Sequence, residues 1–273
     1  MKLKPLYLLA TDRLRKNWLK LHKAAIVNRL ARGQRHYTRF VILCTGRVGS
    51  NMVTSYLNSN PAIVAKGEIF GQHHLPASKV PADFDVKRYL ESEAFHDYPR
   101  GISAVGFKLF YTHAKRKLPH RNAMWKLIES DRSIKIIHLT RENLMRAYLS
   151  KVIADRTAKW TQSGIINAVS TDEKRTELKY EDCRQIFVQV ESWQNEANST
   201  FGEHDVLHVT YEKITADPDP TLATIQKFLE VQPRSLSSFH TRQNPEPLET
   251  LIENYAALKR QFAGTRWSHF FED

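Results

Sequence analysis

Apolar residues occur along this chain in short, regularly separated runs. Four of them, at residues 40–44, 105–110, 134–139 and 205–210, combine Val, Ile, Leu and Phe with few polar residues. Runs of this length with β-branched and aromatic side chains are typical of strands that are buried on both faces. They predict four strands of a covered sheet.

Helical patterns fill the intervals between these runs. Helices are predicted from the first run to residue 58 and over residues 122–130, 144–154, 180–197 and 221–229. Strands that alternate with helices indicate βαβ units and a largely parallel sheet. The predicted fold is therefore an α/β domain of three layers, with helices on both faces of a central sheet. A last amphipathic helix is predicted over residues 245–262, with Gly264 placed to end it.

The first 37 residues differ from the rest in charge. Residues 1–36 hold 10 basic residues and one acidic residue, whereas the remaining 237 hold 31 basic and 28 acidic residues. Apolar residues at helical spacing (Leu14, Trp18, Leu21 and Ala25) predict a helix over residues 6–31. Such a basic helix either lies on an anionic membrane surface or packs on the domain with a solvated face. We predict a basic helical extension at 1–37 and one domain at 38–273.

Composition excludes several other classes of protein. The two cysteines, Cys44 and Cys183, have no metal-binding spacing, so no metal site is predicted. No apolar run approaches the length of a membrane span, and the first residues lack the layout of a signal peptide. The nearly balanced charge of residues 38–273 argues against nucleic acid as a partner. We expect a cytoplasmic protein with possible peripheral contact at the inner membrane face through its basic extension, and the sequence does not indicate its oligomeric state.

The strongest local motif is the turn at residues 45–51, between the first predicted strand and its helix. Gly46 and Gly49 allow a tight turn, and the start of a helix offers free N–H groups to an anion. Arg47 adds a positive charge, while Ser50 and Asn51 add donors. This strand–turn–helix unit makes the predicted domain P-loop-type, although the Gly-Lys-Ser/Thr string of nucleotide triphosphatases is missing.

Residues 47–51, Arg-Val-Gly-Ser-Asn, resemble the first loop of sulfotransferases that use 3′-phosphoadenosine 5′-phosphosulfate (PAPS). The closest resemblance is to bacterial carbohydrate sulfotransferases of the nodulation-factor type and to tyrosylprotein sulfotransferases. Val48 and Asn51 depart from the family pattern. The resemblance implies that Arg47, Val48, Gly49, Ser50 and Asn51 bind the 5′-phosphosulfate end of PAPS.

Two further blocks resemble the same family around its reacting groups. The string 57–61, Leu-Asn-Ser-Asn-Pro, precedes Gly67 and Glu68, and in the family this glutamate is the catalytic base. Lys108, inside an apolar run, resembles the cation that approaches the leaving phosphate. Cytosolic relatives place a histidine two residues after this lysine, where this chain has Phe110, so His113 is a weaker alternative to Glu68 as the base.

The resemblance extends to the 3′-phosphate and the adenine. Arg141, at the end of a predicted strand, and Ser150, nine residues later, resemble the family's 3′-phosphate site. Arginine offers a planar fork to phosphate oxygens, and serine adds a compact donor. Tyr211 resembles an aromatic residue near the adenine, with core packing as the alternative. Residues 242–245, Arg-Gln-Asn-Pro, resemble the late loop that closes over the nucleotide, with Arg242 as its candidate binding residue.

The function implied by this resemblance is transfer of a sulfuryl group from PAPS to a hydroxyl group of a carbohydrate or glycolipid, with release of 3′-phosphoadenosine 5′-phosphate (PAP). Glu68 would act as the base, and Arg47 and Lys108 would stabilise the charge that develops. Two alternatives remain: a P-loop kinase-like nucleotide enzyme, or a non-enzymatic module that binds membranes or nucleic acid through the basic extension.

Overall fold

The computed structural model describes residues 33–76, 80–81, 83–115, 119–161 and 169–272. A five-stranded sheet forms its centre, with the order β2-β3-β1-β4-β5. All four pairs of neighbouring strands are parallel. The strands are β1 (Thr38–Cys44), β2 (Ile63–Lys66), β3 (Ala104–Phe110), β4 (Lys135–Thr140) and β5 (Val206–Thr210).

The central strand β1 contributes side chains to both faces of the sheet. Val41 and Leu43 belong to one buried cluster, whereas Phe40, Ile42 and Cys44 belong to another. This alternation follows from the period of two along a strand. Helices therefore cover both faces, as expected for a parallel sheet.

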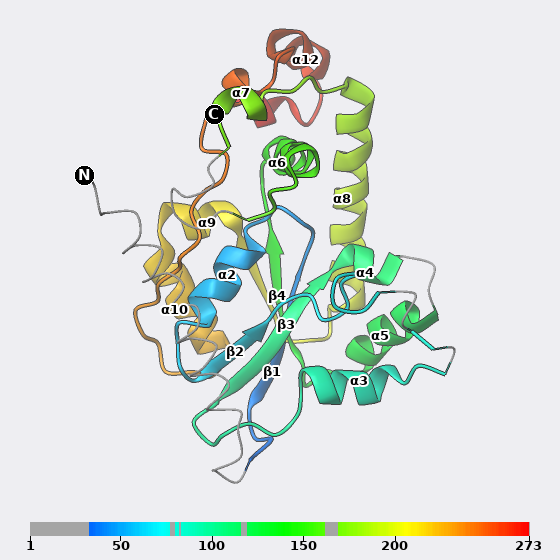
Figure 1. The fold of residues 1–273 in the computed structure, drawn as a ribbon, viewed down its shortest axis with the longest axis vertical. Coiled ribbons are helices and arrows are strands. Elements are labelled where there is room, and N and C mark those ends of the chain that lie inside the picture. The colour runs from blue at the N-terminus through cyan, green and yellow to red at the C-terminus, as the bar shows by residue number, and fades with distance from the viewer. Residues whose placement is uncertain (1–32, 77–79, 82, 116–118, 162–168, 273) are drawn as a thin grey trace, which may run out of the picture.

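Two groups of helices form these outer layers (Figure 1). The face of Val41 is covered by α3 (Val86–Glu93), α5 (Pro119–Ser130) and the second half of α8 (Tyr180–Thr200). The opposite face is covered by α2 (Ser50–Leu57), α9 (Tyr211–Ala216) and α10 (Pro218–Phe228). The short helix α4 (Tyr111–Lys115) follows β3 directly. The three-layer α/β fold predicted from the sequence is confirmed.

A third buried cluster lies beyond the carboxyl ends of the strands. It joins α6 (Leu144–Thr157) and the first half of α8 to α11 (Leu248–Leu251), α12 (Tyr255–Phe262) and η2 (Ser268–Phe271). Figure 1 shows α6, α7 (Thr171–Lys174) and α12 above the sheet, at the end where β4 points. This cluster places the chain's C-terminal third next to the carboxyl edge of the sheet, where parallel folds bind their ligands.

The four predicted strands are confirmed, and one was missed. β2 has only four residues and ends in a lysine, so its apolar run was too short to detect. Tyr211 begins helix α9 directly after β5, with Thr210 as the N-cap. None of the helices in the described ranges combines the length and apolar character that crossing a membrane requires.

The single helix predicted over 245–262 is wrong. The chain forms α11 and α12, separated at Ile252, which is extended. Thr176 accounts for the break, because it donates its N–H to the carbonyl of Leu251 and accepts from the N–H of Glu253. The carbonyl of Leu251 and the N–H of Glu253 therefore bond to residue 176 rather than within a helix. Gly264 does follow α12 in the left-handed conformation, with φ of 74°.

The predicted N-terminal helix at 6–31 lies outside the described residues. Residues 33–37, at the end of the predicted extension, pack on the domain. Gln34 pairs with Tyr98 through backbone hydrogen bonds of 2.8 and 3.0 Å. Arg35 forms ion pairs with Glu91 and Asp97.

Candidate functional site

The turn between β1 and α2 has the geometry of an anion-binding loop. Arg47 and Gly49 both have positive φ, at 67° and 78°, which turns the chain sharply before α2 begins at Ser50. The first N–H groups of a helix have no partner within the helix, and its N-terminus carries partial positive charge. A Cβ atom on Gly49 would lie 2.6 Å from a ring carbon of Tyr211, so glycine also permits this close contact.

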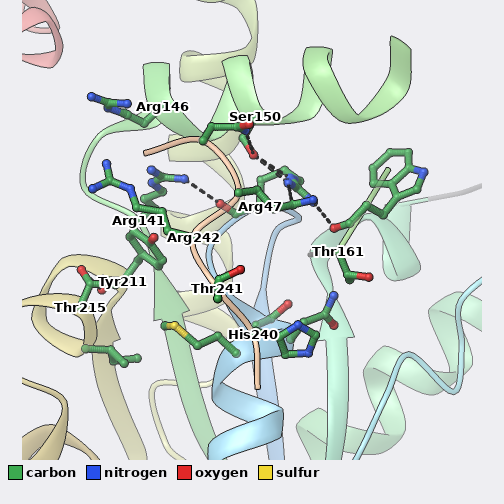
Figure 2. A pocket seen from close by; sticks show the side chains of 18 of the residues that line it. Arg47, Arg141, Arg146, Ser150, Thr161, Tyr211, Thr215, His240, Thr241 and Arg242 are labelled. Carbon is green, nitrogen blue, oxygen red and sulfur yellow. Dashed lines mark hydrogen bonds between the residues drawn. The ribbon is translucent and has the colours of Figure 1, made fainter. Parts of the chain in front are cut away.

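A cavity of about 400 Å³ opens above this turn. Four arginines line it, and none of the lining residues that the structure describes is an aspartate or glutamate. We call it the anion cavity. Figure 2 shows Arg141, Arg146 and Arg242 on one side of it, and Thr161 on the other, beyond Arg47. Apolar side chains complete the wall on the α2 and α9 side: Met52, Tyr56, Ile214 and Pro218.

The Arg47 side chain contacts only neutral acceptors. Its Nε and Nη2 lie 2.9 and 2.8 Å from Ser150 Oγ, and its Nη1 lies 2.6 Å from the carbonyl oxygen of Trp160. Nη2 also donates to Gln243 Oε1. Burial lowers the pKa of Arg47, with Asp155 acting in the opposite direction. Arg47 and Ser150, predicted to bind opposite ends of PAPS, therefore lie side by side.

Arg141 is buried and only partly paired. Its guanidinium lies 4.5 Å from the centre of the Tyr211 ring, and its Nη1 donates to the carbonyl of Arg47 at 3.2 Å. Glu212 Oε1 is 3.8 Å from Nε, which is buried and has no hydrogen-bond partner among the described residues. Burial lowers the pKa of Arg141 to about 10, against the opposing effects of Tyr211 and Glu212. A buried cation with an unused donor favours an incoming anion.

The other residues predicted to bind the nucleotide differ in whether their side chains reach the cavity. Gly49, Ser50 and Asn51 line it, together with Tyr211 and Arg242. The Val48 side chain is 1% exposed and lies in the core against the sheet. A ligand in the cavity can therefore use only the backbone of Val48.

A second group of polar residues gathers at the carboxyl ends of β2 and β3. Lys108, on β3, is 4% exposed. Its Nζ lies 3.2 Å from Glu68 Oε1 and also donates to Asn51 Oδ1. Since Asn51 lines the anion cavity, Lys108 connects the carboxylate of Glu68 to the cavity wall.

His113 completes this group, which we call the Glu68 cluster (Asn51, Glu68, Lys108 and His113). The N–H of Phe110 donates to His113 Nδ1 at 3.2 Å, so a neutral ring carries its proton on Nε2. His113 Nε2 lies 3.8 Å from Glu68 Oε2. The two alternative bases predicted from the sequence are therefore neighbours, and each carboxylate oxygen of Glu68 faces a different cation or donor.

A segment without regular secondary structure crosses the anion cavity. We call residues 240–246 the strap; Figure 2 shows His240, Thr241 and Arg242 on it. Asn244 Nδ2 lies 3.2 Å from Ser150 Oγ. The sequence placed residues 242–245 in a loop over the nucleotide and named Arg242 as a binding residue; His240 and Thr241, which also line the cavity, were missed.

Sequence reasoning also missed Arg146 and Trp160. Arg146 lies one helical turn before Ser150 on α6, so the spacing of four residues could have identified it. No local pattern identifies Trp160, because it reaches Arg47 across 113 residues of sequence.

Comparisons with known proteins identify the family of this chain. The family described as "Sulfotransferase domain" matches residues 37–262. Nodulation protein H of Rhizobium tropici is 24% identical over 242 residues, which cover 85% of this chain and 92% of that protein. Nodulation protein H of Rhizobium meliloti strain 1021 is 23% identical over 239 residues, covering 85% and 94% of the two chains.

Two solved structures are also similar. A sulfotransferase from Alicyclobacillus acidocaldarius has a TM-score of 0.48 at 15% identity, covering 86% of this chain and 95% of its own. A mouse sulfotransferase complexed with PAP has a TM-score of 0.39 at 13% identity, covering 74% and 62%. With the family match over most of the described domain, the chain belongs to the sulfotransferase family and is a sulfotransferase enzyme.

Proposed function

We propose that this enzyme transfers the sulfuryl group of PAPS to a hydroxyl group of a carbohydrate or glycolipid. The observation that carries the proposal is the anion cavity, in which four arginines face no lining carboxylate among the described residues. A nucleotide with phosphate groups at both the 3′ and 5′ positions supplies the charge that these arginines lack.

The cavity residues divide between the two ends of such a nucleotide. The N–H groups at the start of α2, with Ser50, suit the 5′-phosphosulfate. Arg141, Arg242 and Ser150 suit the 3′-phosphate. The ring of Tyr211 and the apolar wall beside it suit the adenine.

The Glu68 cluster suits the chemistry of the transfer. The acceptor hydroxyl gives its proton to a carboxylate oxygen of Glu68 as its oxygen bonds to sulfur, and the bond from sulfur to the bridging phosphate oxygen breaks. Lys108 Nζ, beside Asn51 on the cavity wall, stabilises the negative charge that gathers on the departing phosphate. PAP and the sulfated acceptor are the products. His113 Nε2 lies 3.8 Å from the second oxygen of Glu68.

The acceptor class rests on relatives rather than on a described pocket. Relatives named nodulation protein H and the resemblance to carbohydrate sulfotransferases support a sugar hydroxyl. The basic residues 1–36 support peripheral contact with an anionic membrane, where a glycolipid acceptor is found. Removal of residues 1–32 should then reduce binding to anionic vesicles and leave turnover of a water-soluble acceptor unchanged.

Thermal stabilisation by PAP, compared with ATP, tests the donor. At a hundred times its dissociation constant, PAP should stabilise the wild type by about 2.7 kcal/mol. ATP, which has no 3′-phosphate, should give a much smaller shift. Arg141→Ala should lose most of the PAP shift. Equal shifts with PAP and ATP, or none with PAP, would contradict the proposed donor.

A further inference from the structure

We propose that Lys174 is a positioning residue that acts through the strap to hold the nucleotide in the anion cavity. The inference rests on the proposed function, because the nucleotide in question is PAPS or PAP. Lys174 itself does not line the cavity.

The strap depends on side chains for its position. Among the hydrogen bonds of the described residues, none joins a backbone N–H of residues 241–246 to a backbone carbonyl. Instead, Gln243 accepts a hydrogen bond from Arg47, and Asn244 donates to Ser150. Gln243 also donates to the carbonyl of Lys159 at 3.2 Å. These contacts lie on the cavity side of the strap.

Lys174, which lies outside the cavity lining, holds the strap through two further contacts. Its Nζ lies 2.9 Å from the carbonyl oxygen of Gln243 and 2.8 Å from Glu246 Oε1. The residue is 5% exposed, so the ion pair is largely shielded from water. Arg146 also donates to the carbonyl of Glu246, at 2.6 Å. A buried ammonium that binds both a backbone carbonyl and a carboxylate fixes two strap residues at once.

The position of Lys174 is itself fixed by local structure. It is the last residue of α7, a single turn that begins with a capping box between Ser170 and Glu173. Two residues later, Thr176 pairs with the backbone around Ile252. The short segment that carries Lys174 is therefore fixed at both ends. This fixes the Lys174 side chain, which in turn fixes the position of the strap.

Loss of the Lys174 contacts should affect nucleotide binding more than catalysis. Gln243 accepts from Arg47, a cavity residue, and Arg242 on the same strap lines the cavity. If Lys174 releases the Gln243 carbonyl, these side chains lose their fixed positions over the nucleotide. The Glu68 cluster has no contact with Lys174 among the hydrogen bonds and ion pairs of the described residues, so the reacting groups stay in place.

The test measures PAP binding and steady-state rates in the full-length protein. Lys174→Met should weaken PAP binding and raise KM for PAPS by about tenfold, the loss expected for a charge-assisted hydrogen bond. At saturating PAPS, kcat should stay within about twofold of wild type or rise where release of PAP is limiting. Lys174→Arg, which keeps a donor, should recover part of the affinity.

Lys179→Met is the matched control, since it removes the same charge from an exposed site five residues later. It should leave PAP binding and KM unchanged. Should Lys174→Met fail to fold, Glu246→Gln removes the ion pair alone and should weaken PAP binding by about threefold.

The possible results separate this inference from the proposed function. Wild type that does not bind PAP contradicts the proposed donor itself. Wild type that binds PAP, with Lys174→Met and Glu246→Gln binding equally well, overturns the role of Lys174. A fall in kcat without a change in KM for PAPS also overturns it, because a general structural defect gives that pattern.

Discussion

The anion cavity and the Glu68 cluster share Asn51, yet they differ in how their charges are paired. In the Glu68 cluster, Lys108 lies 3.2 Å from a carboxylate oxygen, so cation and anion already compensate each other. In the anion cavity, Arg47 binds neutral acceptors and Arg141 keeps an unused buried donor. The cluster is complete without a ligand, whereas the cavity is electrostatically incomplete.

This difference predicts that one region controls nucleotide affinity and the other controls the rate of reaction. A cavity lined by four arginines and, among the described residues, by no carboxylate gains most when a multiply charged anion enters, so it should determine nucleotide affinity. A compensated cluster gains little from ground-state binding and can act on charge that develops during reaction. Variants in the two regions should therefore affect different constants.

Glu68→Gln should give the largest effect and the sharpest separation of the two regions. The amide cannot take the acceptor proton, so kcat should fall by about 10²–10⁴-fold. PAP binding should stay as in wild type, because Glu68 does not line the anion cavity. Calorimetry with PAP beside an initial-rate assay measures both. Turnover near that of wild type would show that Glu68 is not the base.

Gly49→Ala should disturb the wall of the anion cavity at the turn between β1 and α2. Alanine at φ of 78° costs about 1–3 kcal/mol of stability, and its Cβ would push the Tyr211 ring away from its place beside Arg141. We expect a lower free energy of unfolding together with weaker PAP binding.

Gly46→Ala is the control in the same turn, since a Cβ there meets no atom within 4 Å. Urea denaturation and PAP titration of both variants provide the comparison. Equal behaviour of the two variants would remove the packing role assigned to Gly49.

At acid pH, activity can fall because the protein unfolds as well as because catalysis is lost. His138 is one cause of the loss of stability. This buried histidine lies 2.6 Å from the Tyr111 hydroxyl, and burial lowers its pKa from 6.5 to about 4. The unfolded chain then binds more protons between these values, so stability falls as pH drops through that range. The loss between pH 7.5 and pH 5 should be about 2 kcal/mol.

His138→Gln should flatten this dependence, because glutamine does not titrate. Unfolding free energies at pH 7.5 and pH 5, for wild type and variant, measure the difference. An unchanged slope in the variant would assign the acid sensitivity to other groups. The comparison also separates acid inactivation caused by unfolding from loss of catalysis in the folded protein.

His113→Gln should give the smallest effect. Its loss removes the group beside Glu68 Oε2 and leaves Lys108 on the other oxygen, so we expect kcat to fall about threefold to tenfold. PAP binding should not change. His73→Gln, at an exposed site, is the control. A larger loss than that of Glu68→Gln would make His113 the base.

The sequence predicted those parts of the molecule that depend on local pattern. Apolar runs identified β1, β3, β4 and β5. The first three are buried along most of their length, whereas β5 lies at the sheet edge with only Val209 buried. The turn at Arg47 and Gly49 was recognisable because its residues are adjacent in sequence. The short edge strand β2 gave no comparable signal.

Other features depend on contacts between distant residues and left no local pattern. Arg47 reaches Gln243 across 196 residues, and Lys174 reaches Glu246 across 72. The break between α11 and α12 depends on Thr176, which no reading of residues 245–262 reveals. The burial of Val48 likewise depends on how α2 packs on the sheet.

The strand order β2-β3-β1-β4-β5 divides this enzyme along β1. Glu68 and Lys108 come from the β2 and β3 half, whereas Arg141 and Tyr211 follow β4 and β5. In the proposed function, the residues that would meet the acceptor and those that would hold the nucleotide thus come from separate stretches of sequence. A chimera of relatives that exchanges residues 58–115 should then change what is sulfated and keep the same sulfate donor.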